Sequence, residues 1–221
     1  MLSGDQQRSV SLHLCNPSDP RDAVAFSSVN RELRASTQAL LQQLRTDHEL
    51  AAAALCLRVG LRSCKELREA KEVHCHNKGL TAAELSLLGT LGSVLPALEK
   101  LILYESSGAA GPDGVQQLAA GLGAGALPAM TDLQFIRMHV GDAGASALAA
   151  ALGRGALPRL KILWLFRTSI GDAGLVALAP ALQRLPALER LYLDGNPIGD
   201  EGLAALVAPP PQPAGAPPRG R

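Results

Sequence analysis

The sequence of 221 residues predicts an α/β solenoid, in which a curved parallel sheet lines the inside and helices cover the outside. The prediction rests on a recurring Leu-Pro phrase, the alternating apolar run that follows it, and a Gly-rich turn that leads into an Ala/Leu-rich stretch. The phrase returns in steps of 32, 30 and 28 residues, as expected of stacked structural units. Its four copies are Leu95–Leu98, Leu127–Met130, Leu157–Leu160 and Leu185–Leu188.

The run after each phrase alternates between apolar and other residues, which is typical of a half-buried strand. The four runs are Leu101–Leu103, Leu133–Phe135, Leu163–Leu165 and Leu191–Leu193. A step of 28 residues upstream of Leu101 reaches Val73, so we interpret the segment from Val73 to Thr81 as a diverged first unit. About five units result. Because each unit repeats the same strand–turn–helix order, the strands are expected to be parallel.

A turn containing Gly and Asp follows each strand. The turns are Gly111–Gly114, Gly141–Gly144, Gly171–Gly174 and Gly199–Gly202. An Asp at the start of a helix is expected to accept a backbone N–H bond there. The turns lack the alternating oxygen ligands and terminal Glu of a calcium loop, so we interpret them as structural. Leucines at helical spacing follow, at positions 148, 152, 175, 178 and 182, and predict one helix face against the strands.

The last unit carries a family pattern. It reads Leu188-x-x-Leu191-x-Leu193-x-x-Asn196-x-Ile198 and resembles the leucine-rich repeat. The period of ~28 residues with one helix per unit resembles the ribonuclease-inhibitor subtype, over residues 70–208. The resemblance implies that the Asn satisfies backbone groups in the turn. Ser106, Met138 and Thr168 hold this position in the preceding units, so looser turns are expected there.

Residues 1–69 lack the repeated pattern of the later sequence and are expected to form a helical N-terminal cap. Asp19-Pro20 is typical of a helix start. Residues 46–49 (Thr-Asp-His-Glu) fit a capping box, which predicts a second helix with Leu50, Leu57 and further residues up to Arg68 on one face. The segment Asp22–Arg34 resembles the second half of an F-box, which implies a substrate adaptor in ubiquitin-ligase assembly. The Pro-rich residues 209–221 are expected to be disordered.

Composition argues against several classes of function. The net charge is +1 and no segment is strongly basic, so neither nucleic acid nor an anionic membrane is an expected partner. No apolar run reaches the length of a membrane span, and the first residues do not resemble a signal peptide. The four cysteines show no Cys-x-x-Cys pair and suggest buried thiols in a reducing compartment. The expected location is the cytoplasm, with the nucleus as the alternative.

No catalytic residues, metal or cofactor are expected. His74-Cys75-His76 is the one local cluster, but alternation along a strand points Cys75 inward and both histidines outward, so the three side chains diverge. No Ser/His/Asp order, carboxylate pair or phosphate loop is present. The repeats also resemble the Ran type of GTPase-activating protein, a family with about twice as many units, and this implies a second alternative function.

The residues between the strand leucines point outward and form the predicted partner-binding face. They are Ile102, Tyr104, Gln134, Ile136, Trp164, Phe166, Tyr192 and Asp194. Four of the six aromatic residues of the chain fall among them. An exposed apolar patch of this kind usually marks an interaction site, and Trp and Tyr are favoured interface anchors. The predicted function is a non-catalytic protein–protein interaction module that binds another protein through its concave face.

Two other uses of this face remain open. The N-terminal helices or the Pro-rich tail could fold over it. The chain could also associate with itself, because the last unit lacks an obvious polar cap and leaves the C-terminal end of the repeats uncovered.

Overall fold

The computed structural model describes residues 31–111 and 113–208. The chain divides into two compact units, Met1–Leu55 and Cys56–Arg221, and each is described by itself. Helix α3 (Arg31–Val59) begins in the first unit. The predicted break with a capping box at residues 46–49 is wrong, because α3 is continuous there and the Thr46 hydroxyl donates to the Gln42 carbonyl (3.0 Å). The predicted helix start at Asp19 and most of the F-box-like segment lie outside the described residues.

Helix α3 ends at Gly60, whose φ of +93° suits glycine. The Leu61 N–H donates to the Cys56 carbonyl (2.8 Å) and the Gly60 N–H to the Leu57 carbonyl (3.1 Å), which is the Schellman arrangement. A separate short helix follows, α4 (Cys64–Glu69), so the predicted helix continuing to Arg68 is also wrong. Its predicted apolar face is displaced as well: Leu57 is 69% exposed, whereas Cys56 is fully buried.

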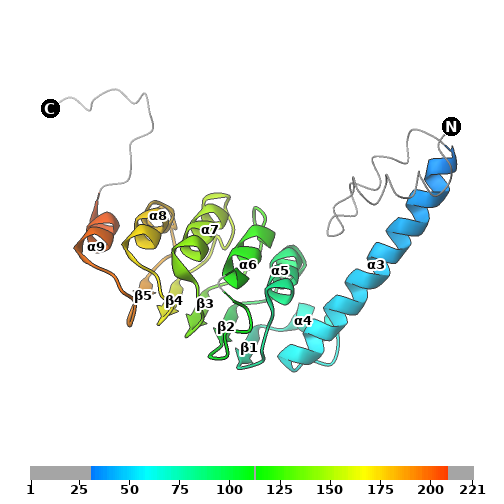
Figure 1. The fold of residues 1–221 in the computed structure, drawn as a ribbon, viewed down its shortest axis with the longest axis horizontal. Coiled ribbons are helices and arrows are strands. Elements are labelled where there is room, and N and C mark those ends of the chain that lie inside the picture. Colours follow the sequence, from blue (N-terminus) through cyan, green and yellow to red (C-terminus); the bar gives the residue numbers. More distant parts are fainter. Residues whose placement is uncertain (1–30, 112, 209–221) are drawn as a thin grey trace. The chain divides into compact units, whose positions relative to one another are not determined.

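The second unit contains a parallel sheet of five strands whose spatial order equals their sequence order. The strands are β1 (Glu72–His76), β2 (Lys100–Tyr104), β3 (Asp132–Ile136), β4 (Ile162–Phe166) and β5 (Arg190–Tyr192). The helices are α5 (Ala82–Leu91), α6 (Gly114–Gly121), α7 (Gly141–Gly153), α8 (Asp172–Leu182) and α9 (Asp200–Val207), with a short 3-10 turn, η1 (Gly92–Val94), after α5. The strands form one layer of this unit and α5–α9 the other (Figure 1). The predicted parallel α/β arrangement is therefore confirmed. The predicted domain limits stay predictions, and the Pro-rich tail lies outside the described residues.

The strands pair in a register that places equivalent residues side by side. Val73, Leu101, Leu133, Leu163 and Leu191 form one row across the sheet, as the step of 28 residues predicted. Further backbone hydrogen bonds between neighbouring units continue this pairing beyond both ends of the strands. Before the strands, for example, the Lys100 N–H donates to the Lys71 carbonyl (3.0 Å), and the equivalent bond recurs between each later pair of units.

The core lies between the strand layer and the helix layer. The inward leucines of β2 and β4 are at most 1% exposed, and so are Leu148, Leu175 and Leu178 from the helices. Leu152 and Leu182 are 5% exposed, so the predicted helix face is confirmed. In the last unit Leu191 and Leu193 are only half-buried. The core thus thins toward β5.

Two of the four turn aspartates, Asp142 and Asp172, bind the next unit. Helices α7 and α8 have no side-chain cap. Instead, Asp142 Oδ1 accepts from the Gly171 N–H of the following unit (2.7 Å). Asp172 Oδ1 likewise accepts from the N–H groups of Gly199 (2.7 Å) and Gly202 (3.0 Å). The expected capping bond within the same turn is therefore wrong for Asp142 and Asp172, whose carboxylates join one unit to the next.

Asn196 performs the turn role that the repeat resemblance implies. Its Oδ1 accepts from the backbone N–H groups of Thr168 (3.0 Å) and Ile170 (3.1 Å), and its Nδ2 donates to the carbonyls of Leu165 (2.5 Å) and Leu193 (2.8 Å). At the equivalent position, Met138 is instead buried in the core, 4% exposed. The sequence therefore identified the role of Asn196 correctly.

Glu105 serves the same purpose three units earlier, and the sequence pattern did not reveal it. It is 5% exposed, and its Oε2 accepts from the Gly79 N–H (2.7 Å) while its Oε1 accepts from the Ser107 N–H (3.0 Å) and hydroxyl (2.5 Å). Burial by itself would raise the pKa of Glu105. The hydrogen bonds from Ser107, Gly79 and Leu80 outweigh burial, so the pKa is lowered from its ordinary value of 4.5.

Glu105→Gln should lower the free energy of unfolding at pH 7 by ~1–3 kcal/mol, because a charge-assisted link between two units is lost. The folded-state pKa of Glu105 lies below the unfolded value, so its carboxylate stabilises the fold above about pH 4.5, and this contribution fades as the pH falls through the folded-state pKa. Urea unfolding at several pH values should show the two proteins converging in acid. Glu99→Gln, which removes an exposed carboxylate paired with Lys71 (3.3 Å), is the control and should show little change at any pH.

Leu163→Ala should cost ~2–5 kcal/mol, because it opens a cavity in the fully buried core. Leu191→Ala removes the same atoms at the same register position, but from the half-buried end of the row, and should cost less. Urea unfolding of both variants measures the difference. Equal costs would contradict the thinning of the core toward β5.

Candidate functional site

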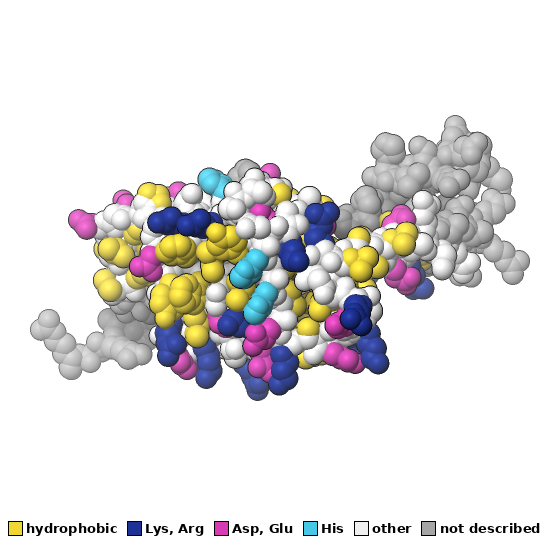
Figure 2. Space-filling view, turned by 90° about the horizontal axis from the view of Figure 1, so that it is seen from below, with side chains coloured by type: hydrophobic (Ala, Val, Ile, Leu, Met, Phe, Trp, Pro, Cys, Tyr) yellow, Lys and Arg dark blue, Asp and Glu magenta, His cyan; other side chains and the backbone are white. Residues whose placement is uncertain are grey.

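The outward side chains of β1–β5 form one continuous surface, which we call the strand face. In β2, β3 and β4 fully buried and half-buried residues alternate. The strand face contains all eight residues predicted to bind a partner, together with His74 and His76. Seven of the eight are half-buried: Ile102, Tyr104, Gln134, Ile136, Trp164, Phe166 and Tyr192. Asp194, just after β5, is exposed. Figure 2 views this side and shows hydrophobic side chains gathered over the strands, with histidines beside them and with Lys and Arg along both the upper and the lower edge.

The polar groups on β1–β3 mostly satisfy one another. Gln134 Nε2 donates to both carboxylate oxygens of Asp132 (3.0 Å each), and Lys100 Nζ lies 3.6 Å from the same carboxylate. His74 Nε2 lies 3.1 Å from Glu72 Oε2. Gln134, Lys100 and His74 therefore have partners within the chain.

The part on β3–β5 is apolar and aromatic. The rings of Trp164 and Tyr192 stack with centroids 3.9 Å apart and an interplanar angle of 24°. Phe166 lies beside Ile136 in the strand register. Ile162, which the sequence analysis did not include, adds a half-buried apolar side chain at the start of β4. We call these five residues the apolar patch.

Two arginines flank the apolar patch, and the prediction missed both. Arg137 and Arg167 each directly follow a strand, are exposed, and have φ values of +56° and +52°. The Cζ of Arg167 lies 5.3 Å from the Phe166 ring centroid, and that of Arg137 lies 6.0 Å from the Tyr104 ring centroid. Among the described residues, neither guanidinium lies in a salt bridge. The one feature of the sequence that could have identified these arginines as site residues is their position directly after a predicted strand.

The left-handed backbone at these two positions recurs at two of the three other equivalent positions in the repeats, Glu105 being the exception. Asn77 directly follows β1, and Gly195 lies at the equivalent position of the last unit, beyond the end of β5; their φ values are +48° and +74°. Asn and Gly tolerate this conformation well, whereas a long side chain is disfavoured. A Cβ at Gly195 would lie 2.5 Å from Arg167 Cγ, so the absence of a side chain at Gly195 makes room for Arg167. The fold thus places two extended cations over aromatic rings at positions that suit smaller residues.

The side chains of His74, Cys75 and His76 point in different directions, as predicted: Cys75 points into the core and both histidines point outward. Cys75 is 2% exposed, and burial raises the pKa of its thiol to about 12. Both histidines lie exposed on the strand face, where their rings stack with centroids 6.2 Å apart. Within residues 31–111 and 113–208, no group of three or more His, Cys, Asp or Glu side chains is placed to hold a metal. None of the described helices is both long and apolar enough to cross a membrane.

Comparison with known proteins adds one finding. A family model described as "Leucine Rich repeat" matches residues 185–207, the segment that contains the last Leu-Pro phrase, β5 and α9. A search of curated proteins finds no match. The matched segment is one of five strand–helix units that share a single register. The matched segment is therefore similar to a leucine-rich repeat, and the four preceding units share its strand register.

Proposed function

We propose that this protein is a non-catalytic interaction module that binds another protein through its strand face. A leucine-rich repeat suggests a protein-interaction module. The observation that carries the proposal is the stacked Trp164–Tyr192 pair, which belongs to a partly solvated sheet surface and not to the core. A solvated strand does not require indole and phenol rings, whereas interfaces favour both as anchors.

The partner segment that fits this surface is apolar with acidic residues beside it. The apolar patch offers Ile136, Ile162 and three aromatic rings. Arg137 and Arg167 add positive charge at its edge, and aromatic rings hold both guanidinium groups in place. A held guanidinium loses less entropy when it binds a carboxylate in bidentate fashion. Asp194 favours a basic group at the β5 end of the partner segment.

The proposal includes finer assignments. We place residues 70–208 in the ribonuclease-inhibitor-like subtype as a solenoid, which makes the strand face concave, and we assign residues 1–69 as its N-terminal cap. The cytoplasmic location stays a prediction, as does self-association. Nothing in the described residues favours the F-box-like adaptor or the GTPase-activating alternative.

Trp164→Ala combined with Phe166→Ala should abolish partner capture while the chain stays folded, because both side chains belong to the strand face and not to the core. The measurement is affinity purification from cells with the intact chain and the variant, compared by quantitative mass spectrometry. Circular dichroism and urea unfolding should confirm that the variant is folded.

Val94→Ala combined with Val176→Ala is the matched control. These side chains are 51% and 41% exposed and lie in η1 and α8, off the strand face. Proteins retained by the intact chain and the control, but lost by the aromatic variant, would be the specific partners. Identical protein lists for all three would refute binding through the apolar patch.

Arg137→Gly combined with Arg167→Gly should weaken partner binding and leave the fold equally or slightly more stable. Glycine relieves the positive-φ strain, which is worth ~1 kcal/mol or more per residue, although it also loosens the unfolded chain. Binding to a purified partner and urea unfolding measure the two effects. Arg159→Ala, at an exposed position before β4, is the control for loss of a positive charge. Unchanged affinity in the glycine variant would remove the arginines from the site.

A further inference from the structure

A pair of thiols lies outside the strand face, where α3 ends and α4 begins. Cys56 is in the last turn of α3 and Cys64 is the first residue of α4. The two Sγ atoms are 3.6 Å apart, and the Cys56 thiol donates toward Cys64. The sequence predicted buried thiols. That expectation is wrong for Cys64, which is exposed.

The connection between the helices holds the two thiols close together. The Schellman bonds of Leu61 and Gly60 fix the end of α3. On the other side, the Ser63 hydroxyl accepts from the Glu66 N–H (3.2 Å), and Glu66 Oε2 accepts from the Arg62 N–H (2.7 Å). These bonds resemble a capping box and fix the start of α4. The proximity of the thiols therefore follows from the two helix caps.

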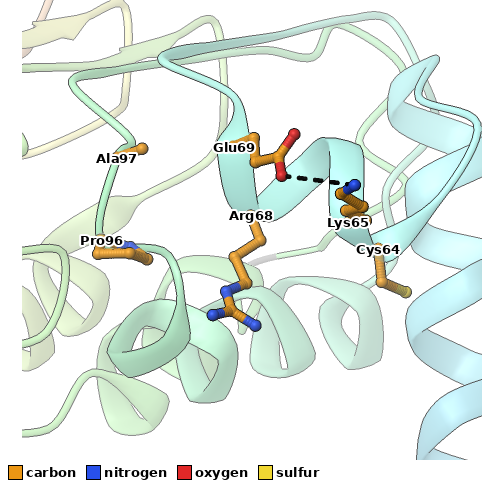
Figure 3. Close-up of a pocket in the computed structure, with 6 residues that line it drawn as sticks. All are labelled: Cys64, Lys65, Arg68, Glu69, Pro96 and Ala97. Carbon is orange, nitrogen blue, oxygen red and sulfur yellow. Dashed lines mark ion pairs between the residues drawn. The ribbon is translucent and has the colours of Figure 1, made fainter.

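The surroundings of the two thiols differ. Cys56 is fully buried. Cys64 borders an open cavity of about 760 Å³ together with Lys65, Arg68, Glu69, Pro96 and Ala97 (Figure 3). Lys65 pairs with Glu69 at 4.0 Å, while Arg68 makes no salt bridge with any described residue. A negatively charged reagent that modifies thiols can therefore reach Cys64 in a cavity that the Arg68 guanidinium also borders.

We propose that Cys64 and Cys56 form a redox modification site, in which a small carboxylate-bearing disulfide such as oxidised glutathione converts the two thiols into an internal disulfide. The cavity admits the reagent, and Arg68 attracts its carboxylates. Closing the bond requires the sulfur atoms to approach from 3.6 Å to ~2.05 Å, which rotation of the exposed Cys64 side chain can provide.

The reaction proceeds by two thiol–disulfide exchanges. The Cys64 thiolate attacks one sulfur of oxidised glutathione, forms a mixed disulfide and expels one glutathione thiolate. The Cys56 sulfur then attacks the Cys64 sulfur of the mixed disulfide, its proton passes to the departing glutathione sulfur, and the second glutathione leaves as a thiol. Two protein thiols are oxidised to one disulfide, and one oxidised glutathione is reduced to two glutathione molecules.

The difference in burial sets the order of these steps. Burial, followed by the hydrogen bond and the charge interaction with Cys64, raises the pKa of Cys56 to about 12. Cys56 is therefore protonated near neutral pH, and Cys64 reacts first. The internal disulfide would join the last turn of α3 to α4, the element that leads into β1.

The test is to incubate the full chain with oxidised glutathione, alkylate the remaining thiols, digest with trypsin and analyse the peptides by mass spectrometry. Arg58 and Arg62 lie between the two cysteines, so an internal disulfide links two separate tryptic peptides that come apart on reduction. We expect this linked pair, preceded in time by glutathione on Cys64. A chain carrying Cys15→Ser and Cys75→Ser should behave in the same way.

Two variants of Cys56 separate the steps. Cys56→Ser and Cys56→Ala should both accumulate glutathione on Cys64, because the resolving thiol is missing, and the alanine variant avoids burying a hydroxyl. If the intact chain also stops at glutathione on Cys64, or if Cys64 pairs equally well with Cys15 or Cys75, the proposal is overturned. Two free thiols at Cys56 and Cys64 after equilibration with excess oxidised glutathione would overturn it as well.

Discussion

The in-register parallel pairing of β1–β5 is the constraint on which the rest of the second unit depends. Side chains alternate along a strand, so a slip of one residue would turn an inward leucine row toward solvent and bring the aromatic row into the core. The shared register prevents this, because Leu101, Leu133 and Leu163 lie side by side and are nearly inaccessible to solvent. The same register aligns the strand face. A binding surface and a core are thus produced together by one hydrogen-bonding pattern.

Polar links between neighbouring units reinforce this register, and their chemistry changes from unit to unit. Glu105 joins the first unit to the second through the Gly79 N–H. Asp142 and Asp172 join later units through glycine N–H groups, and Asn196 joins the last two through Thr168 and Ile170. In each case a side-chain oxygen accepts N–H bonds that the turn would otherwise leave unpaired. A unit cannot form this turn alone, so adjacent units depend on one another for stability.

The sequence was sufficient for features set by periodicity. The Leu-Pro phrase and the alternating runs predicted the strands, the parallel order and the leucines of α7 and α8, because each depends on a residue's position within its own unit. Features set by interactions outside the local pattern were missed. Glu105 stands one residue before the expected Asn position. The capping-box motif at residues 46–49 was overridden, because good helix formers on both sides allow α3 to continue through it.

The candidate site was predictable to the same extent. Its eight residues were identified by counting alternate positions from the strand leucines. The same count would have pointed Arg137 and Arg167 inward, yet both side chains are exposed. Their backbone conformation separates a structural role from a recognition role. The left-handed form of the turn requires only a residue that tolerates positive φ, and Asn77 and Gly195 meet that requirement at equivalent positions. Arginine there strains the backbone, and its charged group reaches back over Phe166 or Tyr104 and away from the turn. Each arginine strains the backbone, and its guanidinium group does not stabilise the turn. We therefore explain both arginines by what their guanidinium groups, which border the apolar patch, can bind.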